Sequence, residues 1–324
     1  MKLDFHKNHR LLYGVVLFGF IALSAVVAMA PALSEVRRAT PLPGAAPLTA
    51  IQRRGLDVYV AEGCLYCHTQ QVRPLAQDTL RYGRASVAAD FARIAPMDQW
   101  RGAPRVLGSE RTGPDLTSIG TRQPSEVWHY IHLYQPRAVV AASIMPAYPW
   151  LFEHKAAAGP GDVVVPLPPE VAPSSGVVVA RPAAQALVAY LLSRQQAPLA
   201  QTGKAATPPP TADNHGAIVY DTRCSSCHQP AGQGLPGAFP PLAGDPVVQA
   251  EDPTRHVEIV LFGLSGASIE GTAYVSPMPA WGTSLSDDEI AAVVNHERSS
   301  WGNAAPPVTA EFVARIRARG ADAQ

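Results

Sequence analysis

All four cysteines of the chain lie in two copies of one pattern, Cys-x-x-Cys-His. The copies comprise Cys64, Cys67 and His68, and Cys224, Cys227 and His228. Two thiols three positions apart on one helical turn can each bond a vinyl group of the same porphyrin, and the adjacent histidine then lies under the iron. The spacing therefore predicts two covalently bound haem c groups, each with a histidine as its proximal iron ligand.

Other uses of paired cysteines fit this pattern less well. A structural zinc ion needs four soft ligands, whereas each motif offers three, and joining the two motifs would leave histidines unused. A thioredoxin-like dithiol does not need the adjacent histidine. Four cysteines in 324 residues are also too few for a disulfide scaffold.

A haem that only transfers electrons needs a sixth iron ligand, and methionine in that position raises the reduction potential. Met145 and Met278 follow the first and second motifs, and each begins the same Met-Pro-Ala-aromatic sequence. The proline fixes the backbone beside the sulfur. We predict Met145 and Met278 as the distal ligands, while Met97 lacks this context and is expected to fill space in the core.

A Pro-x-Leu element follows each motif, at Pro114 and Leu116 and again at Pro240 and Leu242. A carbonyl group in this element can accept a hydrogen bond from Nδ1 of the haem histidine and so fix its tautomer. We assign these four residues to the haem pockets. The alternative is that the prolines only mark loops.

The surroundings of the two motifs also repeat. A glycine stands four residues before an aromatic residue ahead of each motif, as Gly55 and Tyr59 and as Gly216 and Tyr220. Such a glycine lets a second helix pack closely. Amphipathic helices are predicted over 182–194, which begins with proline, and over 286–301, which begins with a capping box.

The other histidines lack comparable patterns. His129 and His132 lie three residues apart on a predicted helix and are expected to be satisfied surface or interface groups rather than metal ligands. Five others are expected to be solvated: His6, His9, His154, His215 and His256.

Residues 11–33 form an uncharged run of 23 residues. As a helix this run is about 35 Å long, enough to cross a hydrocarbon core of roughly 30 Å. A cleaved signal peptide is the alternative, because Ala28, Met29 and Ala30 resemble a cleavage site. The run is longer than a signal core, however, and Pro31 would follow the cut. We therefore predict an uncleaved membrane anchor.

The charges beside this anchor give its orientation. Lys2, Lys7 and Arg10 precede it, which places the N-terminus in the cytoplasm, although Arg37 and Arg38 follow it. Covalent haem is attached outside the bacterial cytoplasmic membrane, which favours the same orientation. We therefore expect a single-pass protein of the inner membrane with periplasmic haem domains.

These features predict a mainly α protein in which one N-terminal transmembrane helix precedes two cytochrome c-like helical haem domains. The expected order is an anchor over 1–39, a linker over 40–50, a first cytochrome domain over 51–196, a proline-rich linker over 197–212, a second cytochrome domain over 213–303 and a tail over 304–324. Within the first domain, 156–180 is expected to be a surface excursion or a hairpin. The tail is expected to be a short helix or disordered.

The chain has 26 basic and 26 acidic residues, and this balance gives no reason to expect nucleic-acid binding. The charge is unevenly divided, because 213–303 holds 11 acidic and 3 basic residues whereas 51–196 holds 11 acidic and 14 basic residues. An acidic surface would steer a basic donor protein. The alternative is a face that is only solvated.

Residues 48–151 resemble the monohaem subunit II of cbb(3)-type cytochrome c oxidases. Besides the first haem motif, the resemblance rests on the segments 71–74, 81–83, 111–116, 128–129, 132, 136–137 and 145–151. The anchor lies where that family has its single transmembrane helix. Residues 213–303 resemble a class I cytochrome c domain, so the chain resembles a fusion of the two.

The resemblance implies an electron-transfer subunit of aerobic respiration. Such a subunit passes electrons to the catalytic haem–copper subunit and has no oxygen-reducing site of its own. We expect the order periplasmic donor cytochrome c, second-domain haem, first-domain haem, catalytic subunit. The appended domain is a departure, and we hypothesise that it replaces a separate dihaem subunit, at least in part. Ala85, His296 and the segment 101–107 also depart from the family pattern.

Three rival functions remain open from the sequence. A delivery subunit of a nitric oxide reductase is similar, but the segments 111–116 and 145–151 favour the oxidase. A dihaem peroxidase needs an open iron position, whereas each domain supplies its own methionine. A haem-based sensor would need an output domain, and the sequence suggests none.

Overall fold

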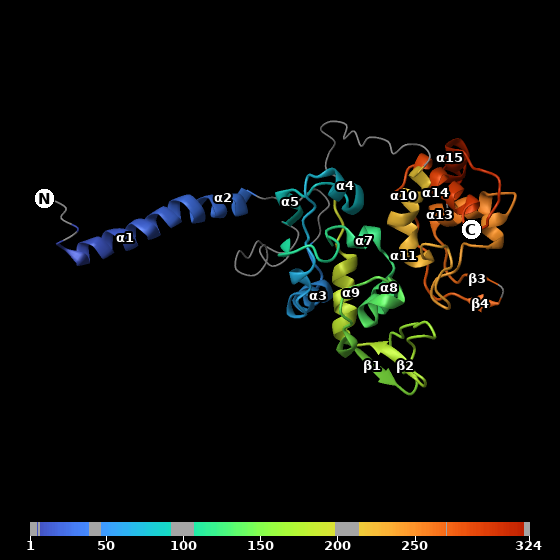
Figure 1. Ribbon diagram of the computed structural model, residues 1–324, viewed down its shortest axis with the longest axis horizontal. Coiled ribbons are helices and arrows are strands. Elements are labelled where there is room, and N and C mark those ends of the chain that lie inside the picture. The colour runs from blue at the N-terminus through green and yellow to red at the C-terminus, as the bar shows by residue number, and fades with distance from the viewer. Residues whose placement is uncertain are drawn as a thin grey trace.

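The structure is a computed structural model that describes residues 5, 7–38, 47–91, 107–197, 214–269 and 271–320. It is mainly helical, as predicted, and a long N-terminal helix extends away from the packed body (Figure 1). Met97 lies outside the described residues, as do residues 101–106 of the segment that departs from the family pattern.

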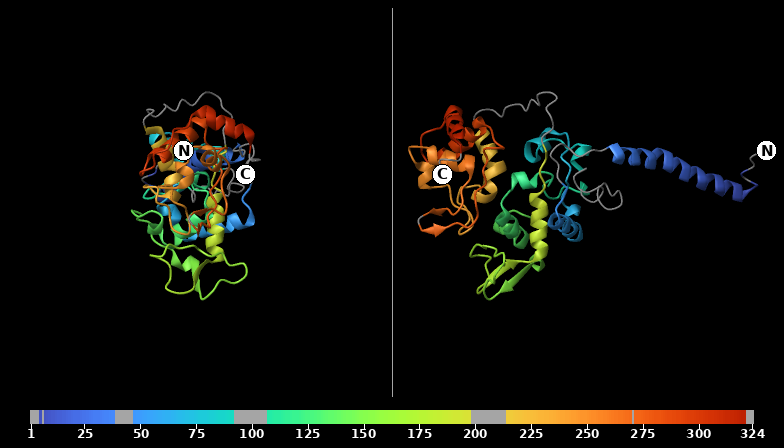
Figure 2. Two further views of the ribbon diagram at one scale, coloured as in Figure 1. Left: turned by 90° about the vertical axis from the view of Figure 1, so that its right-hand side faces the viewer. Right: turned by 180° about the vertical axis from the view of Figure 1, so that it is seen from behind.

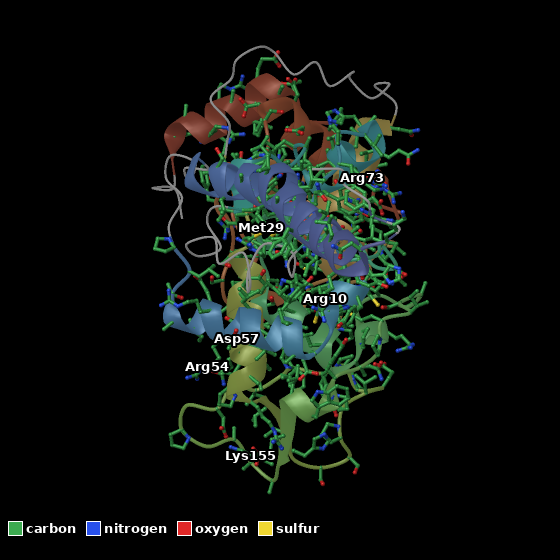
Figure 3. All side chains as sticks on the ribbon, turned by 90° about the vertical axis from the view of Figure 1, so that its left-hand side faces the viewer. Arg10, Met29, Arg54, Asp57, Arg73 and Lys155 are labelled. Carbon is green, nitrogen blue, oxygen red and sulfur yellow. The ribbon has the colours of Figure 1, made fainter. Side chains whose placement is uncertain are left out.

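The N-terminal helix consists of α1 (His9–Ser24), the π-helical turn η1 (Ala25–Met29) and α2 (Ala30–Arg38). Asn8 caps it by accepting a hydrogen bond from the Leu11 N–H at 3.1 Å. The stretch His9–Ser34 has a mean hydropathy of 2.5, and none of its residues is buried. It is long and apolar enough to cross a membrane. Figure 3 shows Arg10 and Met29 on this helix.

The wide turn η1 has a local cause. Pro31 has no N–H group, and its ring would clash with the carbonyl of the fourth residue before it in a regular helix. In η1 the Ala30 N–H donates instead to the carbonyl of Ala25, five residues back. This wider turn makes room for the proline and keeps the helix continuous.

The first packed unit precedes the undescribed segment 198–213. Its helices are α3 (Ala50–Ala61), η2 (Cys64–Tyr66), α4 (Ala76–Tyr82), α5 (Ala88–Phe91), α7 (Ile119–Arg122), α8 (Glu126–Tyr134), η3 (Pro136–Ala138), η4 (Pro149–Leu151) and α9 (Pro182–Leu192). Strands β1 (Phe152–Lys155) and β2 (Val177–Ala180) pair antiparallel, with Phe152 opposite Ala180. This pair closes the predicted excursion 156–180 as a hairpin, and Lys155 lies on it in Figure 3.

The second packed unit follows that segment. Its elements are α10 (His215–Val219), η6 (Tyr220–Cys224), α11 (Ser225–His228), α12 (Pro246–Gln249), α13 (Thr254–Phe262), the short antiparallel strands β3 (Ser268–Ile269) and β4 (Thr272–Ala273), α14 (Asp287–Ser299) and α15 (Ala310–Arg319). The predicted capping box is present, because Ser286 and Glu289 bond reciprocally at the start of α14. Val308, Val313 and Ile316 are buried in the second core. The region expected as a tail is therefore packed up to residue 320.

Arg298 is fully buried at the centre of the second unit. Its guanidinium donates to the carbonyl oxygens of Val248, Ala250 and Pro306, each at 2.8 Å. One side chain thereby joins α14 to α12 and to the segment before α15, and its buried guanidinium finds three carbonyl acceptors.

Close helix contacts form where the repeated glycines predicted them. A Cβ atom on Gly55 of α3 would lie 1.9 Å from the carbonyl oxygen of Ala186 on α9. A Cβ atom on Gly216 of α10 would lie 2.2 Å from the carbonyl oxygen of Ala292 on α14. The prediction of close packing at both glycines is confirmed.

The two units are in contact. Figure 1 shows α11 of the second unit beside α8 of the first, and the view from behind in Figure 2 agrees. Ser226 of α11 forms hydrogen bonds with Gln123 and Trp128 of the first unit.

We expect Gly55→Ala to lower the free energy of unfolding by about 1–3 kcal/mol, because the added methyl group forces α3 and α9 apart. Thermal unfolding of the full-length protein in detergent measures the change. Gly159→Ala is the matched control, since a Cβ atom there meets only the Asp162 carboxylate at 3.5 Å. Equal stability of the two variants would contradict this account of the α3–α9 contact.

Candidate haem sites

The first motif folds as a tight turn directly after α3. The N–H groups of Cys67 and His68 both donate to the carbonyl of Cys64, at 3.2 and 3.0 Å. The Nδ1 atom of His68 lies 2.7 Å from the carbonyl oxygen of Pro114. A carbonyl oxygen can only accept, so Nδ1 carries the proton and Nε2 is the nitrogen left to bind a metal.

The segment around Pro114 is attached to the first motif on both sides. A Cβ atom on Gly113 would lie 2.3 Å from Cε1 of His68, so only glycine lets the backbone lie against this ring. The Asp115 carboxylate accepts from the Thr69 hydroxyl at 2.6 Å and from the Gln71 N–H at 2.8 Å. The histidine is therefore held between its own loop and the 113–115 segment.

The loop of Met145 lies against the same site. Met145 is partly buried in the first core, where Cys64 and Tyr148 also pack. The Tyr148 N–H donates to the Leu133 carbonyl at 2.9 Å, which fixes the loop to α8. Burial, together with the nearby Cys64 and Cys67, raises the pKa of Tyr148 to about 12.

The second motif is built in the same way with different local structure. Cys224 ends the π-helical turn η6, and the other motif residues lie on α11. The Nδ1 atom of His228 lies 2.9 Å from the carbonyl oxygen of Pro240. As at the first motif, the carbonyl acceptor leaves Nε2 free for a metal. Burial lowers the pKa values of both His228 and His68, which favours the neutral, metal-binding form.

An open cavity lies at the second motif, with about 450 Å³ of empty space, part of it continuous with solvent. It is lined by the motif residues Cys224, Cys227 and His228 and by the predicted distal ligand Met278. Pro240 and Trp281 also line it. Met278 is held by two backbone bonds with Leu264, at 2.8 and 3.1 Å. Two thiols, one imidazole and one thioether around a largely apolar cavity are the donor set of a haem c, so these residues fit that group.

Part of this cavity wall comes from the first unit. Gln123, Pro124 and Ser125, which precede α8, line the same cavity. Sequence reasoning missed these residues, because neither their types nor their spacing indicates a contact about 100 residues away along the chain.

A cluster of charged side chains around the buried Asp78 carboxylate stabilises the loops of the first site. The Asp78 side chain accepts from Arg73 at 2.8 and 3.0 Å and from Arg111 at 2.6 Å, and Asp78 is only 4% exposed. Arg111 also donates to the Gln71 carbonyl. The cluster thus joins the 71–73 loop, which follows the haem motif, to the segment that begins at Arg111 and contains Pro114. The hydrogen bonds from Arg73 are the largest cause that lowers the pKa of Asp78 to about 2.

The other histidines show one correction. His129 is buried at the junction of the units and bonds the Gln123 carbonyl through Nε2 at 2.9 Å, in agreement with a satisfied interface group. His256 was expected to be solvated, and this is wrong: it is buried and pairs with Glu297 at 2.8 Å. The expectation failed because the two residues are 41 positions apart and meet only when α13 packs on α14. Among the described residues, no group of three or more His, Cys, Asp or Glu side chains could hold a metal ion.

Comparison with known proteins agrees with this geometry. Residues 4–160 match the family described as the mono-heme subunit of cytochrome c oxidase (FixO), and residues 211–296 match subunit III of cbb3-type cytochrome c oxidase. Cytochrome c-552 of Thermus thermophilus is 42% identical over 113 residues, which are 32% of this chain and 85% of that protein. The chain belongs to the c-type cytochromes. It joins a cbb3-type mono-haem module to a second cytochrome c module, as the resemblance implied.

Cytochromes from other assemblies are also similar. The cytochrome c subunit of the quinone alcohol dehydrogenase of Gluconobacter oxydans (strain 621H) is 42% identical over 109 residues, 33% of this chain. The gluconate 2-dehydrogenase cytochrome c subunit of Pantoea cypripedii is 41% identical over 104 residues, 32% of this chain. The chain spans about a quarter of the length of these subunits, 23% and 24%. Membership of the c-type cytochromes implies covalently bound haem c.

Protonation of Asp78 makes the free energy of unfolding depend on pH. Because the pKa of Asp78 is lower in the folded protein than the usual value of about 3.9, its contribution is complete above about pH 4 and is lost as the pH falls towards 2. We expect Asp78→Asn to cost about 2 kcal/mol of unfolding free energy at pH 7 and to flatten the acid limb of the stability curve. Urea unfolding from pH 7 to pH 3 measures both effects.

The control for this prediction is Asp162→Asn, which breaks a partly exposed pair with Lys155 and is expected to change stability little. A stability loss in Asp78→Asn that stayed constant down to pH 3 would contradict the assignment.

The predicted distal ligands can be tested one at a time. Met145→His and Met278→His are each expected to remove the methionine-to-iron absorption band of one haem and to lower the reduction potential of that haem. Absorption spectroscopy of the oxidised protein and a redox titration measure both changes, with Met29→Leu as the control. If either variant kept both bands, that methionine would not be a ligand.

Proposed function

We propose that the chain is a membrane-anchored dihaem cytochrome that carries electrons from a periplasmic donor cytochrome c to the catalytic haem–copper subunit of a cbb3-type oxidase. The observation that supports this most is the repetition of one site geometry in both modules. In each, a Cys-x-x-Cys-His turn holds its histidine by an Nδ1–carbonyl bond, at 2.7 and 2.9 Å. The family match of residues 4–160 supports the oxidase as the destination.

The residues at each site suit electron transfer rather than catalysis. A bound haem supplies a one-electron iron couple. The cysteines would attach it, and its iron would be held by His68 and Met145 in the first module and by His228 and Met278 in the second. With a histidine and a methionine on each iron, neither site would offer a place for oxygen or peroxide to bind.

The exit point for electrons is proposed at the first module. Three large apolar side chains are exposed beside its haem motif, with exposed fractions of 65% for Tyr66, 74% for Ile144 and 56% for Trp150. Tyr66 lies between the two cysteines, and Ile144 precedes the predicted distal methionine. Exposed apolar groups around a haem edge are typical of a protein docking face, so we infer that the catalytic subunit binds here.

The entry point is proposed at the second module, whose sequence is strongly acidic. Asp221, Glu251, Asp252 and Asp288 are exposed on it. These carboxylates would attract a basic donor and raise its association rate. The match of residues 211–296 to subunit III of the same oxidase supports the hypothesis that this module replaces a separate haem subunit. We place the haem modules in the periplasm and the N-terminus in the cytoplasm, as the flanking charges and covalent haem attachment indicate.

Gentle purification of the full-length chain from its native membrane tests this function. We expect the catalytic haem–copper subunit to co-purify and two covalent haems to be found per chain. A nitric oxide reductase subunit in its place would overturn the oxidase assignment. A separate dihaem subunit in the same complex would contradict the replacement hypothesis alone.

The electrostatic proposal predicts a salt effect. The reduction rate of the protein by a basic cytochrome c is expected to fall steeply as the ionic strength rises. Glu251→Lys combined with Asp288→Lys should slow reduction several-fold at low salt, whereas the exposed Glu153→Lys in the first module should not. Stopped-flow reduction kinetics measure this, and a rate independent of salt would rule out steering.

A further inference from the structure

Part of the contact between the two modules lies at the N-terminal end of α8. The indole Nε1 of Trp128 donates to the Ser226 carbonyl oxygen at 2.9 Å, and Gln123 Nε2 donates to the Ser226 hydroxyl at 2.6 Å. The hydroxyl groups of Ser125 and Ser276 lie 3.0 Å apart in a buried position. We name these five residues the junction.

The junction lies on the second haem site itself. Ser226 stands between Cys224 and Cys227, so Trp128 bonds the very turn that would carry the second haem. The Gln123 side-chain oxygen is 3.6 Å from Sγ of Cys227. Gln123 and Ser125 also line the open cavity of that site. The first module is therefore part of the wall of the second haem pocket.

The same helix also reaches the first haem site. Trp128 stacks on His132 with ring centroids 4.4 Å apart and an interplanar angle of 13°. Leu133 follows His132 on α8. Its carbonyl accepts a hydrogen bond from the Tyr148 N–H at 2.9 Å and so holds the loop of the predicted ligand Met145. From Trp128 to Leu133 the helix rises only about 7.5 Å. Figure 1 shows α8 between α9 of the first core and α11 of the second module.

The pair of rings between the sites is neutral and nearly dry. Trp128 is 8% exposed. Burial, together with the nearby His129 and His68, lowers the pKa of His132 to about 3, so the ring is uncharged at neutral pH. A packed, uncharged pair of aromatic rings provides electronic contact between two sites without a charge that would need to be solvated.

We propose that α8, through Trp128, is the bridge that holds the two haem sites together and passes electrons between them. This inference rests on the proposed dihaem electron-transfer function. With both haems bound, one electron would pass from the haem held by His228 to the haem held by His68. No bond forms or breaks, and no proton moves. Trp128 is a positioning residue that touches neither iron, and it joins the two sites by its hydrogen bond and its stacked ring.

The test uses the full chain, purified with both haems and without its oxidase. A photoreductant reduces one haem, and the equilibration of the electron with the other is followed by absorption. We expect Trp128→Leu to slow this step by at least an order of magnitude, because both the bond to Ser226 and the stacked ring are lost. Trp128→Phe keeps an aromatic ring and should slow it by less, which covers the case that the leucine variant fails to fold.

Tyr130→Phe is the matched control, because it removes a hydrogen bond within α8, from the Tyr130 hydroxyl to the Glu126 carboxylate at 2.8 Å, but keeps the contacts of Trp128. Its electron transfer should remain close to that of the unaltered protein. Hydrogen exchange of the peptide 223–229 gives a second readout, and exchange should rise in Trp128→Leu because the turn loses its partner. Haem content and both reduction potentials should stay unchanged in all variants.

Unchanged inter-haem rates in both Trp128 variants, with both haems present, would overturn the proposal. So would an equal loss of rate in Tyr130→Phe. Because the oxidase takes no part in these measurements, a wrong assignment of the catalytic partner would leave their outcome unaffected.

Discussion

The interaction on which both sites depend is the hydrogen bond from a histidine Nδ1 to a proline carbonyl. It joins His68 to Pro114 and His228 to Pro240. Because a carbonyl can only accept, this bond settles the tautomer of each ring and directs Nε2 to the metal position. Much of the first module supports the bond: Gly113 lets the backbone reach the ring, Asp115 ties the segment to the motif loop, and the Asp78 cluster fixes the same segment from its other end.

What could be predicted from the sequence was local or repeated. The haem motifs, the Pro-x-Leu carbonyls and the capping box of α14 depend on spacings of a few residues, and spacing is visible in a sequence. Gly55 and Gly216 could be recognised as close-packing positions because each stands in the same place relative to its motif. Repetition of an entire pattern also singled out Met145 and Met278. The mainly helical fold and the long apolar N-terminal helix followed from hydropathy and length.

What could not be predicted depends on tertiary contact between distant residues. His256 and Glu297 look like surface groups when considered separately, and they become a buried pair only when α13 meets α14. The packing of residues 304–320 depends on a groove that other helices build. Gln123 and Ser125 become part of the second haem pocket only because the modules meet in one orientation, and no periodicity or motif in either module encodes that orientation.

The junction also changes how the charge of the two modules should be understood. An acidic second module can attract a donor from many directions, but the side of its pocket near Cys227 is covered by Gln123 and Ser125. A donor must therefore approach another part of the second module. The covered side then faces the first module, whose own open face, around Tyr66 and Ile144, lies beside the other haem motif. On the proposed route, entry, internal transfer and exit would use three separate surfaces, and α8 would connect the second to the third.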